Sequence, residues 1–460
     1  EVPMATDYLD ELASFVTSTR LEDLDESTVG AAKNVVLDTI GAMLAGSRLP
    51  ENANFARLAC TLDRGGEGSD GGATLIGHGR KVQPLFAALV NATAGVALEM
   101  DEGSRLGGGH PSIHVTPGAL AVAEEQGRDG KALLESIIVG YEVTSRIGGA
   151  TQSRADIHSH GTWGTIGTAA ATARLLGFDA GETRTAMNMA TSMSPANTWT
   201  PCLEGATVRN LYPGRSGFQG ILAAHLTKCG FTAVADGPSD LYANVLGQGF
   251  DREAVVDGLG QRGSYRIQEN YFKLHACCLY NHPALDAVQY LLRGEKIAAS
   301  GIDSIRIEAP PIALIMADPE PENMLSAKFS IPYAVAANIV RGTTDITSFY
   351  AEPVSDPEIK ALAQRVEVVA DPEMNLRRYD YPASRVTISL KDGRVLQHSV
   401  TAHHGDSRNP ASQDELVGKF RFLTSEVLGE ARTQQVIDTV SRLDSLDGVG
   451  ELTGLLAPPL

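Results

Sequence analysis

Val35-Val36-Leu37-Asp38-Thr39-Ile40-Gly41-Ala42-Met43-Leu44-Ala45-Gly46 is the stretch of sequence that decides the fold. Read at helical spacing, its apolar side chains fall on nearly every face of a helix. A helix that is apolar all round is normally buried on all sides, as in the core of a bundle. We therefore expect a central helix here, surrounded by other helices.

Further segments before residue 265 carry the same pattern. Pro84 stands where the first turn of a helix accepts a proline, and Gly177 and Gly230 stand where a glycine ends a helix. The segments are rich in Ala, Gly and Leu, and small residues allow helices to approach closely. The predicted helices are residues 84–100, 131–147, 165–176 and 217–229.

The hydrophobic pattern of the sequence changes near residue 270, from helical spacing to a mixture of alternating and helical segments. Segments 303–308 and 365–369 alternate like strands. Two more alternating segments, 385–390 and 394–400, flank Lys391-Asp392-Gly393, which is a strong hairpin signal. Helical patterns lie between these strands and return at the end of the chain, at residues 330–340, 356–364, 416–428 and 434–456.

These patterns predict a mainly α protein with a smaller α+β domain. We assign residues 4–268 and 408–460 to a large all-helical domain. Residues 269–407 form the predicted smaller α+β domain. No internal repeat or low-complexity stretch is evident.

Composition narrows the classes of function. The chain has 460 residues, of which 43% are hydrophobic and 20% charged, so it can bury a sizeable core. Its formal net charge of −18 makes nucleic acid and anionic membranes poor partners. A few Arg, Lys and His residues in a cleft can still bind a small anion, because a pocket is governed by its nearest charges.

The cysteines and the apolar segments indicate the compartment. The five cysteines show no CxxC spacing, so we expect no disulfide framework and a reducing, cytoplasmic location. The N-terminal residues 1–6 lack the basic and apolar regions of a secretory signal. The most apolar segments are short and broken by glycine, so we predict no membrane span.

The first candidate cluster joins Asp101 to His110. Asp101 stands where an apolar helix is expected to end, and Gly107-Gly108-Gly109 permit a loop whose backbone can approach a ligand closely. His110 can accept or donate a proton near neutral pH. A capping aspartate and a hydrogen-bonded loop histidine would look the same, so this segment alone leaves both interpretations open.

The next two clusters each precede a predicted helix. His158 and His160 stand where the free amides of a helix N-terminus favour an anion. Their spacing also suits a metal, but no third ligand follows at a recognised spacing. Arg209 and Arg215 suit bidentate binding of a carboxylate, and a solvated or capping role is equally consistent with the sequence.

The last two candidates lie in the predicted smaller domain. Lys273 stands among aromatic and apolar neighbours, in Tyr271-Phe272-Lys273-Leu274-His275. This setting suggests that the lysine ammonium is held in a fixed position within the protein. Tyr333 is able to donate a proton, although a buried tyrosine with a satisfied hydroxyl is the commoner case.

Taken in order, these segments resemble the MmgE/PrpD family. Its members include 2-methylcitrate dehydratase, cis-aconitate decarboxylase and iminodisuccinate epimerase. The resemblance runs from Leu37-Asp38-Thr39-Ile40-Gly41 to residues 441–456, essentially the whole chain. It implies a large helical domain, a smaller α/β lid, a homodimer, and an active site between the domains with no metal and no organic cofactor.

The resemblance also implies site residues. The family has an acidic motif, two histidines, a lysine with a histidine after it, and a tyrosine found in decarboxylase-like members. By position these fall on Asp101, His110, His158, Lys273, His282 and Tyr333. A small shift of the alignment in the loop would place the second histidine at His160 instead of His158.

Three departures bear on the substrate. The family often has a basic residue four positions after the glycine of a Leu-x-x-Gly motif; here that residue is Phe218, and Arg209 or Arg215 would have to replace it. A histidine that some decarboxylases have five residues after the lysine is Cys278. The loop between Asp101 and His110 differs in length from that of the family, and it carries Arg105, a further candidate substrate ligand.

The sequence therefore predicts a cofactor-independent lyase acting on a small di- or tricarboxylate. In this hypothesis a histidine removes the proton α to a carboxylate, while Lys273 and nearby arginines hold the substrate. Our first expectation is a 2-methylcitrate dehydratase-like hydro-lyase. The alternatives are a cis-aconitate decarboxylase-like carboxy-lyase, an iminodisuccinate epimerase-like isomerase, a metal-dependent lyase, and an inactive carboxylate-binding homologue, which Phe218 favours.

Overall fold

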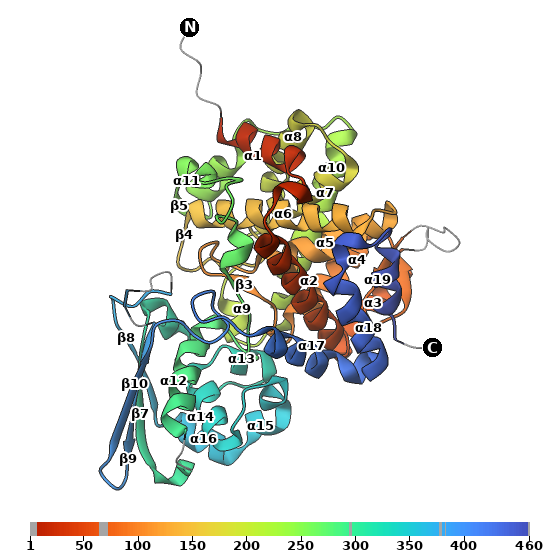
Figure 1. Cartoon of the computed structure of the whole chain (residues 1–460). Coiled ribbons are helices and arrows are strands. Elements are labelled where there is room, and N and C mark those ends of the chain that lie inside the picture. The colour runs from red at the N-terminus through yellow and green to blue at the C-terminus, as the bar shows by residue number, and fades with distance from the viewer. Residues whose placement is uncertain (1–6, 64–71, 294–296, 377–379, 382, 459–460) are drawn as a thin grey trace.

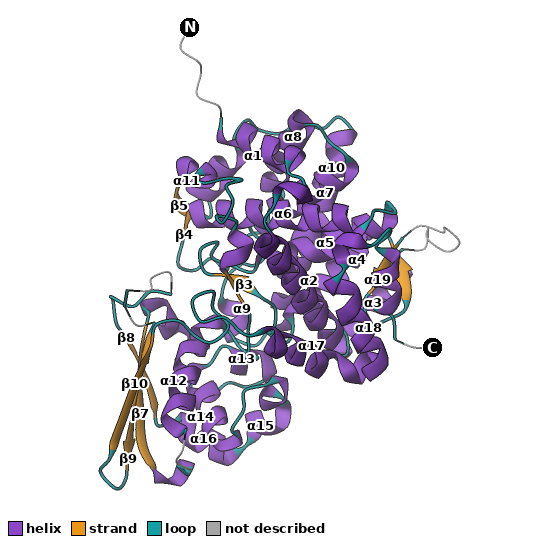
Figure 2. Ribbon diagram, viewed as in Figure 1, coloured by secondary structure: helices purple, strands orange, loops and turns teal. Residues whose placement is uncertain are grey.

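The computed structural model describes residues 7–63, 72–293, 297–376, 380–381 and 383–458. Residues 1–6, on which we based the absence of a secretory signal, lie outside this range. Helices dominate the molecule, and the larger sheet lies at one end of it, in the lid (Figure 2). The predicted class, mainly helical with a smaller mixed α/β region, is confirmed.

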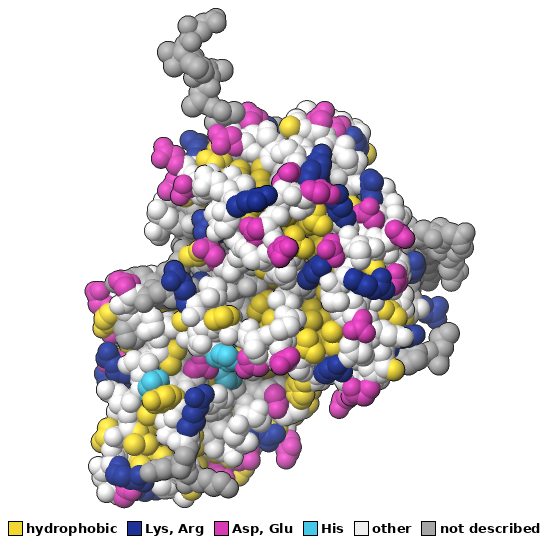
Figure 3. Space-filling model, in the orientation of Figure 1, with side chains coloured by type: hydrophobic (Ala, Val, Ile, Leu, Met, Phe, Trp, Pro, Cys, Tyr) yellow, Lys and Arg dark blue, Asp and Glu magenta, His cyan; other side chains and the backbone are white. Residues whose placement is uncertain are grey.

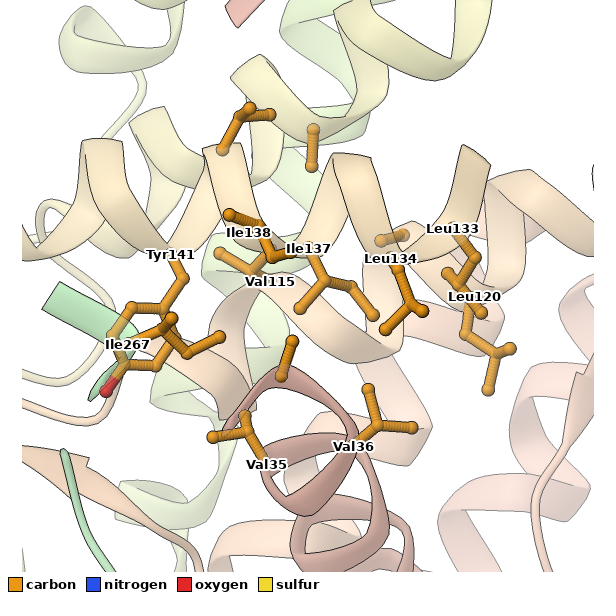
Figure 4. Close-up of a cluster of buried hydrophobic side chains, with 14 of the residues drawn as sticks. Val35, Val36, Val115, Leu120, Leu133, Leu134, Ile137, Ile138, Tyr141 and Ile267 are labelled. Atoms are coloured by element: carbon orange, nitrogen blue, oxygen red, sulfur yellow. The ribbon is translucent and has the colours of Figure 1, made fainter. Parts of the chain in front are cut away.

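Helix α2 (Glu26–Gly46) lies at the centre of the helical body, as predicted. The Asp25 side chain caps its first turn by accepting a hydrogen bond from the Thr28 amide at 2.7 Å. Val35 and Val36 face Leu134 and Ile137 of α6 (Gly130–Ala150) in the core (Figure 4). The apolar run therefore forms a helix because α6 and its neighbours bury it on every side.

Several helices surround α2 and cross closely. A Cβ atom built on Gly167 would lie 1.8 Å from Thr144 Oγ1 and 2.5 Å from the Gly140 carbonyl oxygen, so α7 can approach α6 only because residue 167 is a glycine. The helical body also contains α1 (Tyr8–Ser18), α3 (Pro50–Leu62), α4 (Pro84–Val96), α5 (Pro111–Glu125), α7 (Gly164–Leu176), α8 (Ala180–Ser192) and α10 (Leu211–Lys228), with the short α9 (Thr200–Leu203) and α11 (Arg252–Val256); of these, α4 and α5 pack directly against α2.

Three short strand pairs depart from the prediction that this domain is entirely helical. They are β1 (Ala73–Leu75) with β2 (Arg80–Val82), β4 (Thr151–Ser153) with β5 (Gly247–Phe250), and β3 (Gly103–Ser104) with β6 (Asn270–Tyr271). Each strand is two to four residues long, too short to show a period of two in the sequence. The β3–β6 pair ties the loop after α4 to the segment that enters the lid.

The lid contains a four-stranded sheet with the order β10-β9-β7-β8. Strands β7 (Ile302–Ala309), β9 (Ser384–Leu390) and β10 (Val395–Val400) are antiparallel neighbours, and β8 (Val366–Ala370) runs parallel to β7. The predicted hairpin is confirmed, since β9 and β10 pair across Lys391-Asp392-Gly393. Helices α12 (His282–Leu292), α14 (Ile331–Arg341) and α16 (Pro357–Ala363) pack beside the sheet, and the lid also contains α13 (Met324–Lys328) and α15 (Ala351–Ser355) (Figure 1).

The end of the chain returns to the helical body, as predicted. Helix α17 (Gln413–Leu428) packs against α2, although some 370 residues separate them in sequence (Figure 1). The predicted helix over residues 434–456 is instead two helices, α18 (Glu430–Ser441) and α19 (Gly450–Leu455), separated by a turn.

Two further expectations concern cysteines and membranes. All five cysteines are free thiols, so the prediction of no disulfide is confirmed. Among the described residues, no helix combines the length and the apolar character that crossing a bilayer requires. On the face in Figure 3, acidic and basic side chains alternate across the surface.

Candidate active site

The acidic segment begins where α4 ends. Helix α4 stops at Val96, four residues before the end of the predicted helix, and Glu99 takes a left-handed backbone conformation with φ of +53°. Among the described residues it is the one non-glycine residue with positive φ. Such conformations cost about 1–3 kcal/mol and persist where the surroundings impose them, often at functional sites.

A chain of buried charges starts at Glu99. Its Oε1 lies 2.5 Å from Arg209 Nη1, and its Oε2 accepts a hydrogen bond from Lys273 Nζ at 2.8 Å. Lys273 Nζ also donates to Asp101 Oδ1 at 3.4 Å. These four side chains are at most 1% exposed. Two carboxylates and two cations thus balance one another inside the protein, which limits the cost of burying them.

The charges hold one another in their ionised forms. Burial acts to raise the pKa of the Asp101 carboxyl, but Lys273 and His110 outweigh it and hold that pKa well below its ordinary value. Burial acts to lower the pKa of the Lys273 ammonium, and the Asp101 and Glu99 carboxylates raise it instead. Asp101 is therefore a carboxylate, and Lys273 a cation, throughout the physiological pH range.

His110 is oriented from its Nδ1 side. Nδ1 lies 2.7 Å from the Glu102 carbonyl oxygen and 3.0 Å from Asp101 Oδ2. The proton of the neutral ring is therefore on Nδ1, between two acceptors, and Nε2 is left to accept. Nε2 lies 3.5 Å from the Tyr271 hydroxyl. This arrangement suits a histidine that exchanges protons through Nε2.

Two more histidines lie against His110. The His160 ring centroid is 4.3 Å from that of His110 and 4.9 Å from that of His158. Burial, and then the charges of His110 and Arg209, hold the pKa of both rings well below 6.5, so both are neutral. Neither ring nitrogen of His160, nor Nε2 of His158, has a hydrogen-bond partner among the described residues. Buried polar groups of this kind are normally hydrogen-bonded, so these three nitrogens are candidates for contact with a ligand.

His114 has a different role from these three. Its Nδ1 donates to the His110 carbonyl oxygen at 2.6 Å, and its Nε2 accepts from the Gly161 amide at 2.8 Å. Burial lowers its pKa to about 4, so it stays neutral. Because both ring nitrogens are used, His114 fixes the loop that carries His158 and His160.

These side chains surround a cavity of about 400 Å³ between the helical body and the lid. The volume fits a small organic acid. Its polar wall includes Glu99, Arg105, His110, Arg154, His158, His160, Arg209 and Tyr271, and its apolar wall includes Ile157, Trp163, Trp199, Pro310, Ile312, Phe329 and Leu376.

Seven of the ten predicted site residues meet at this cavity. Arg105, His110, His158, His160 and Arg209 line it, and Asp101 and Lys273 lie directly behind that wall, in contact with His110 and Glu99. The sequence left open whether His158 or His160 is the second histidine of the site. Both line the cavity, so no choice between them is needed.

Three predicted residues lie outside the residues that line the cavity. The Tyr333 hydroxyl donates to the Ser348 carbonyl oxygen at 2.7 Å inside the lid. His282 is buried one layer further back and donates to the Cys277 carbonyl oxygen at 3.2 Å. Arg215 is exposed and bonds to Asn197. Phe218 packs against Phe86, with ring centroids 6.0 Å apart, so the cavity receives its cation from Arg209 instead.

The sequence interpretation missed Glu99 and Tyr271. Both stand in segments that we singled out, two residues before Asp101 and two residues before Lys273. Nothing in the local sequence indicates that Glu99 leaves the helix and reaches Arg209 and Lys273. A carboxylate at the end of an otherwise apolar run was the one available signal.

One group of side chains in the described part has the spacing of a metal site. Single ligand atoms of Asp101, His110 and His160 lie within 4.8 Å of one another. Nδ1 of His110 already faces the Glu102 carbonyl, so this ring would have to offer Nε2. The expectation that the site uses no metal remains a prediction.

Comparison with known proteins places this architecture in a family. The model of the MmgE/PrpD N-terminal domain matches residues 10–251, and that of the MmgE/PrpD C-terminal domain matches residues 275–444. The chain belongs to the MmgE/PrpD family. The resemblance noted in the sequence is therefore confirmed.

Relatives within the MmgE/PrpD family match over nearly their whole length. Cis-aconitate decarboxylase from Homo sapiens is 26% identical over 477 residues, covering 99% of this chain and 96% of its own. The Mus musculus enzyme of the same name is 25% identical, covering 99% and 94%. The cis-aconitate decarboxylase-like protein oryM from Aspergillus oryzae is 25% identical, covering 98% and 97%.

Proposed function

We propose that this MmgE/PrpD protein is a lyase that acts on a small di- or tricarboxylate by acid–base chemistry, with decarboxylation ahead of dehydration. One observation carries the proposal: His110, oriented by Asp101 at 3.0 Å, lies in the wall of a cavity that also contains the Arg209 guanidinium. A proton-transfer group and an anion-binding group thus face the same small volume.

Binding of the substrate follows from the charges. Arg209 offers a planar fork that matches a carboxylate, and Glu99 holds it in place from the other side. Arg105 lines the same cavity and supplies a second guanidinium for a second carboxylate. Lys273 keeps Glu99 and Asp101 ionised and so preserves this arrangement.

Proton transfer is assigned to His110. In decarboxylation the bond from carbon to the leaving carboxylate breaks, CO₂ departs, and the electron pair left on carbon takes a proton from Nε2 of the imidazolium. In dehydration Nε2 removes the proton α to a carboxylate, and a second group protonates the leaving hydroxyl. Asp101 compensates the positive charge that the ring carries in either case.

The neutral histidines suit a different task. His158 Nδ1 accepts from the His160 amide at 3.0 Å, so the proton of the neutral ring is on Nε2. That N–H and an N–H of His160 can donate to a carboxylate oxygen on which enolate-like charge develops. Donors held in place before the reaction stabilise such charge effectively.

Two observations support decarboxylation over our first expectation, dehydration. The curated relatives described above carry the name cis-aconitate decarboxylase. The cavity also has an apolar wall, in which Trp199 packs against His158 with ring centroids 4.2 Å apart and the planes tilted by 39°. An apolar surface around a carboxylate disfavours its charge and so favours loss of CO₂.

The inactive carboxylate-binding homologue remains the rival of another class. Its support was Phe218, but Arg209 supplies a cation to the cavity from a different position. A panel of cis-aconitate, 2-methylcitrate and iminodisuccinate, followed by NMR in D₂O, separates the possibilities. Loss of CO₂, loss of water and inversion with deuterium uptake each give different products. Binding without turnover of any polycarboxylate, in wild type as in His110→Gln, would favour the rival. Metal analysis of the purified protein, and turnover after chelation, test the metal-dependent alternative.

A further inference from the structure

The four residues Leu98–Asp101 are bonded by three buried lysines from three distant parts of the chain. Lys328 Nζ donates to the Leu98 carbonyl oxygen at 2.9 Å. Lys273 Nζ donates to the Glu99 carboxylate at 2.8 Å, and Lys419 Nζ donates to the Met100 carbonyl oxygen at 2.7 Å. The turn that carries both acids of the site is therefore fixed from outside its own sequence.

Lys328 differs from the other two lysines in what it contacts. Lys273 and Lys419 each form an ion pair with a carboxylate, the latter with Asp38. Lys328 donates to two backbone carbonyls, those of Leu98 and of Ala276 at 3.1 Å, and its ammonium lies 4.8 Å from the centroid of the Phe349 ring. Its side chain is fully buried. Burying an amine is costly unless its N–H groups are hydrogen-bonded, so both carbonyls are needed to keep this lysine in place.

The two carbonyls belong to the two segments that make the charge network. The Leu98 carbonyl is part of the peptide group that precedes Glu99, so the bond from Lys328 fixes the plane from which the left-handed turn starts. The Ala276 carbonyl follows Lys273 by three residues, next to Cys278 in the cavity wall. Lys328 comes from α13, so one amine joins this lid helix to the Lys273 segment of the lid and to the Leu98 turn of the helical body.

We propose that Lys328 is a positioning residue, which holds Glu99 in its left-handed conformation and so sets the Glu99 contacts with Arg209 and Lys273. The inference rests on the proposed function. Burial, opposed by Glu99, lowers the pKa of Lys328 to about 7, and either protonation form keeps the two N–H donors that the carbonyls need. Because α13 carries the lysine, the charge network is complete only when the lid lies against the helical body.

Two variants of Lys328 test the proposal. Lys328→Met keeps the length of the side chain and removes both donors; Lys328→Gln keeps one amide donor. Loss of alignment in a site of this kind costs about 10- to 100-fold in kcat, so we expect that loss for Lys328→Met and a smaller one for Lys328→Gln. The affinity for tricarballylate, which can be neither dehydrated nor decarboxylated by this route, should fall less than kcat does, because Arg105 keeps its separate partner Asp406.

Two controls separate positioning from general destabilisation. Leu325→Ala, in the same helix and the same core, should lower the melting temperature with little effect on kcat. Lys360→Met replaces an exposed lysine on α16 and should change neither quantity. A crystal structure of Lys328→Met or Lys328→Gln should show residue 99 outside the left-handed region.

Three results would overturn the inference. They are a kcat within twofold of wild type in a folded Lys328→Met protein, a kcat loss no larger than that of Leu325→Ala at equal melting temperature, and an unchanged φ at Glu99. If the wild type neither binds nor converts any polycarboxylate, the proposed function fails, whereas the crystal structure of the variant still decides what Lys328 does to Glu99.

Discussion

Arg105 and Asp406 lie 301 positions apart in the sequence, yet Arg105 Nη1 donates to Asp406 Oδ2 at 2.7 Å. Both side chains are almost fully buried, at 3% and 0% exposure. Arg105 belongs to the loop after Asp101, and Asp406 follows the last lid strand. Asp406 also forms a β-bridge with Tyr271, so the pair closes the edge of the cavity where body and lid meet.

Replacing Asp406 by asparagine should therefore destabilise the protein substantially. Removing one partner of a buried ion pair costs about 3 kcal/mol or more, because the other charge stays buried. Denaturant unfolding measures this loss. As a matched control, Glu367→Gln breaks the exposed Arg306–Glu367 pair, which should contribute at most about 1 kcal/mol. Equal losses of unfolding free energy in the two variants would show that the buried pair stabilises the protein no more than the exposed pair does.

Asp101→Asn should reduce turnover far more than binding. The asparagine keeps the size of the side chain but removes the negative charge beside His110 Nδ1, so the ring loses its compensation during proton transfer. Positioned acid–base groups contribute about 10²–10⁴-fold, and we expect kcat to fall within that range. Steady-state kinetics on the best substrate of the panel measures it, with unfolding curves as a check on stability. A variant that retains kcat but loses affinity would instead make Asp101 a binding residue.

Arg209→Gln should weaken substrate binding. A hydrogen bond to a charged group contributes about 1.5–3 kcal/mol, which corresponds to a 10- to 150-fold rise in the dissociation constant for tricarballylate. Calorimetry measures it directly. Arg215→Gln is the matched control, since Arg215 stands six residues later, on the surface. Were both variants to bind equally well, the carboxylates of the ligand would have to lie elsewhere in the cavity.

The stability of the protein should depend on pH through His403. Burial lowers the pKa of His403 to about 4, although Asp406 and Asp286 oppose this shift. Below pH 6.5 the unfolded chain binds a proton at this residue and the folded protein does not. The contribution of the neutral ring is therefore complete above about pH 6.5 and is lost as the pH falls toward 4, by at most about 1.4 kcal/mol per pH unit.

The corresponding measurement is the free energy of unfolding of wild type and His403→Gln between pH 7.5 and pH 4.5. The wild type should lose stability faster than the variant as the pH falls below 6.5. At pH 7.5 the difference in free energy of unfolding between wild type and variant reports only the change in packing. The difference between the slopes of the two curves against pH therefore reports the protonation of His403. Parallel curves would mean that the ring takes up its proton inside the folded protein.

The helices and the lid hairpin follow from local patterns. Residues 35–46 are apolar on every face, and such a segment has few alternatives to the centre of a bundle. Lys391-Asp392-Gly393 between two alternating segments specifies its turn through a residue with positive φ, and Gly393 has a φ of +89°. The confirmed elements depend on interactions within a few residues of each other.

The end of α4 shows what local patterns could not supply. Ala97-Leu98-Glu99-Met100 continues the apolar run and was predicted as helix, yet the backbone turns left-handed at Glu99. Lysines 174 to 319 positions away make the contacts that stabilise this turn, since Lys273 bonds to Glu99, Lys328 to Leu98 and Lys419 to Met100. The carboxylate at the end of an apolar run is the one local sign of these tertiary contacts, and it does not identify their partners, which is why Glu99 was missed.

The convergence of the site was predictable only in part. Family resemblance brought Asp101, His110 and Lys273 together correctly, because it carries information about distant contacts. It did not distinguish residues that line the cavity from those one layer behind it, such as His282, or from Tyr333 inside the lid. That distinction depends on a few ångströms of packing, which motif spacing does not encode.

The bond from Lys419 to the Met100 carbonyl has a consequence for synthesis of the protein. Lys419 lies on α17, so a nascent chain still attached to the ribosome lacks it until long after α4 and the acidic turn have been translated. The helical body can collapse earlier around α2, but its acidic turn cannot close. Newly made polypeptide should thus acquire its catalytic competence only after α17 has been made and has packed against α2, and a stop codon before α17 would abolish it.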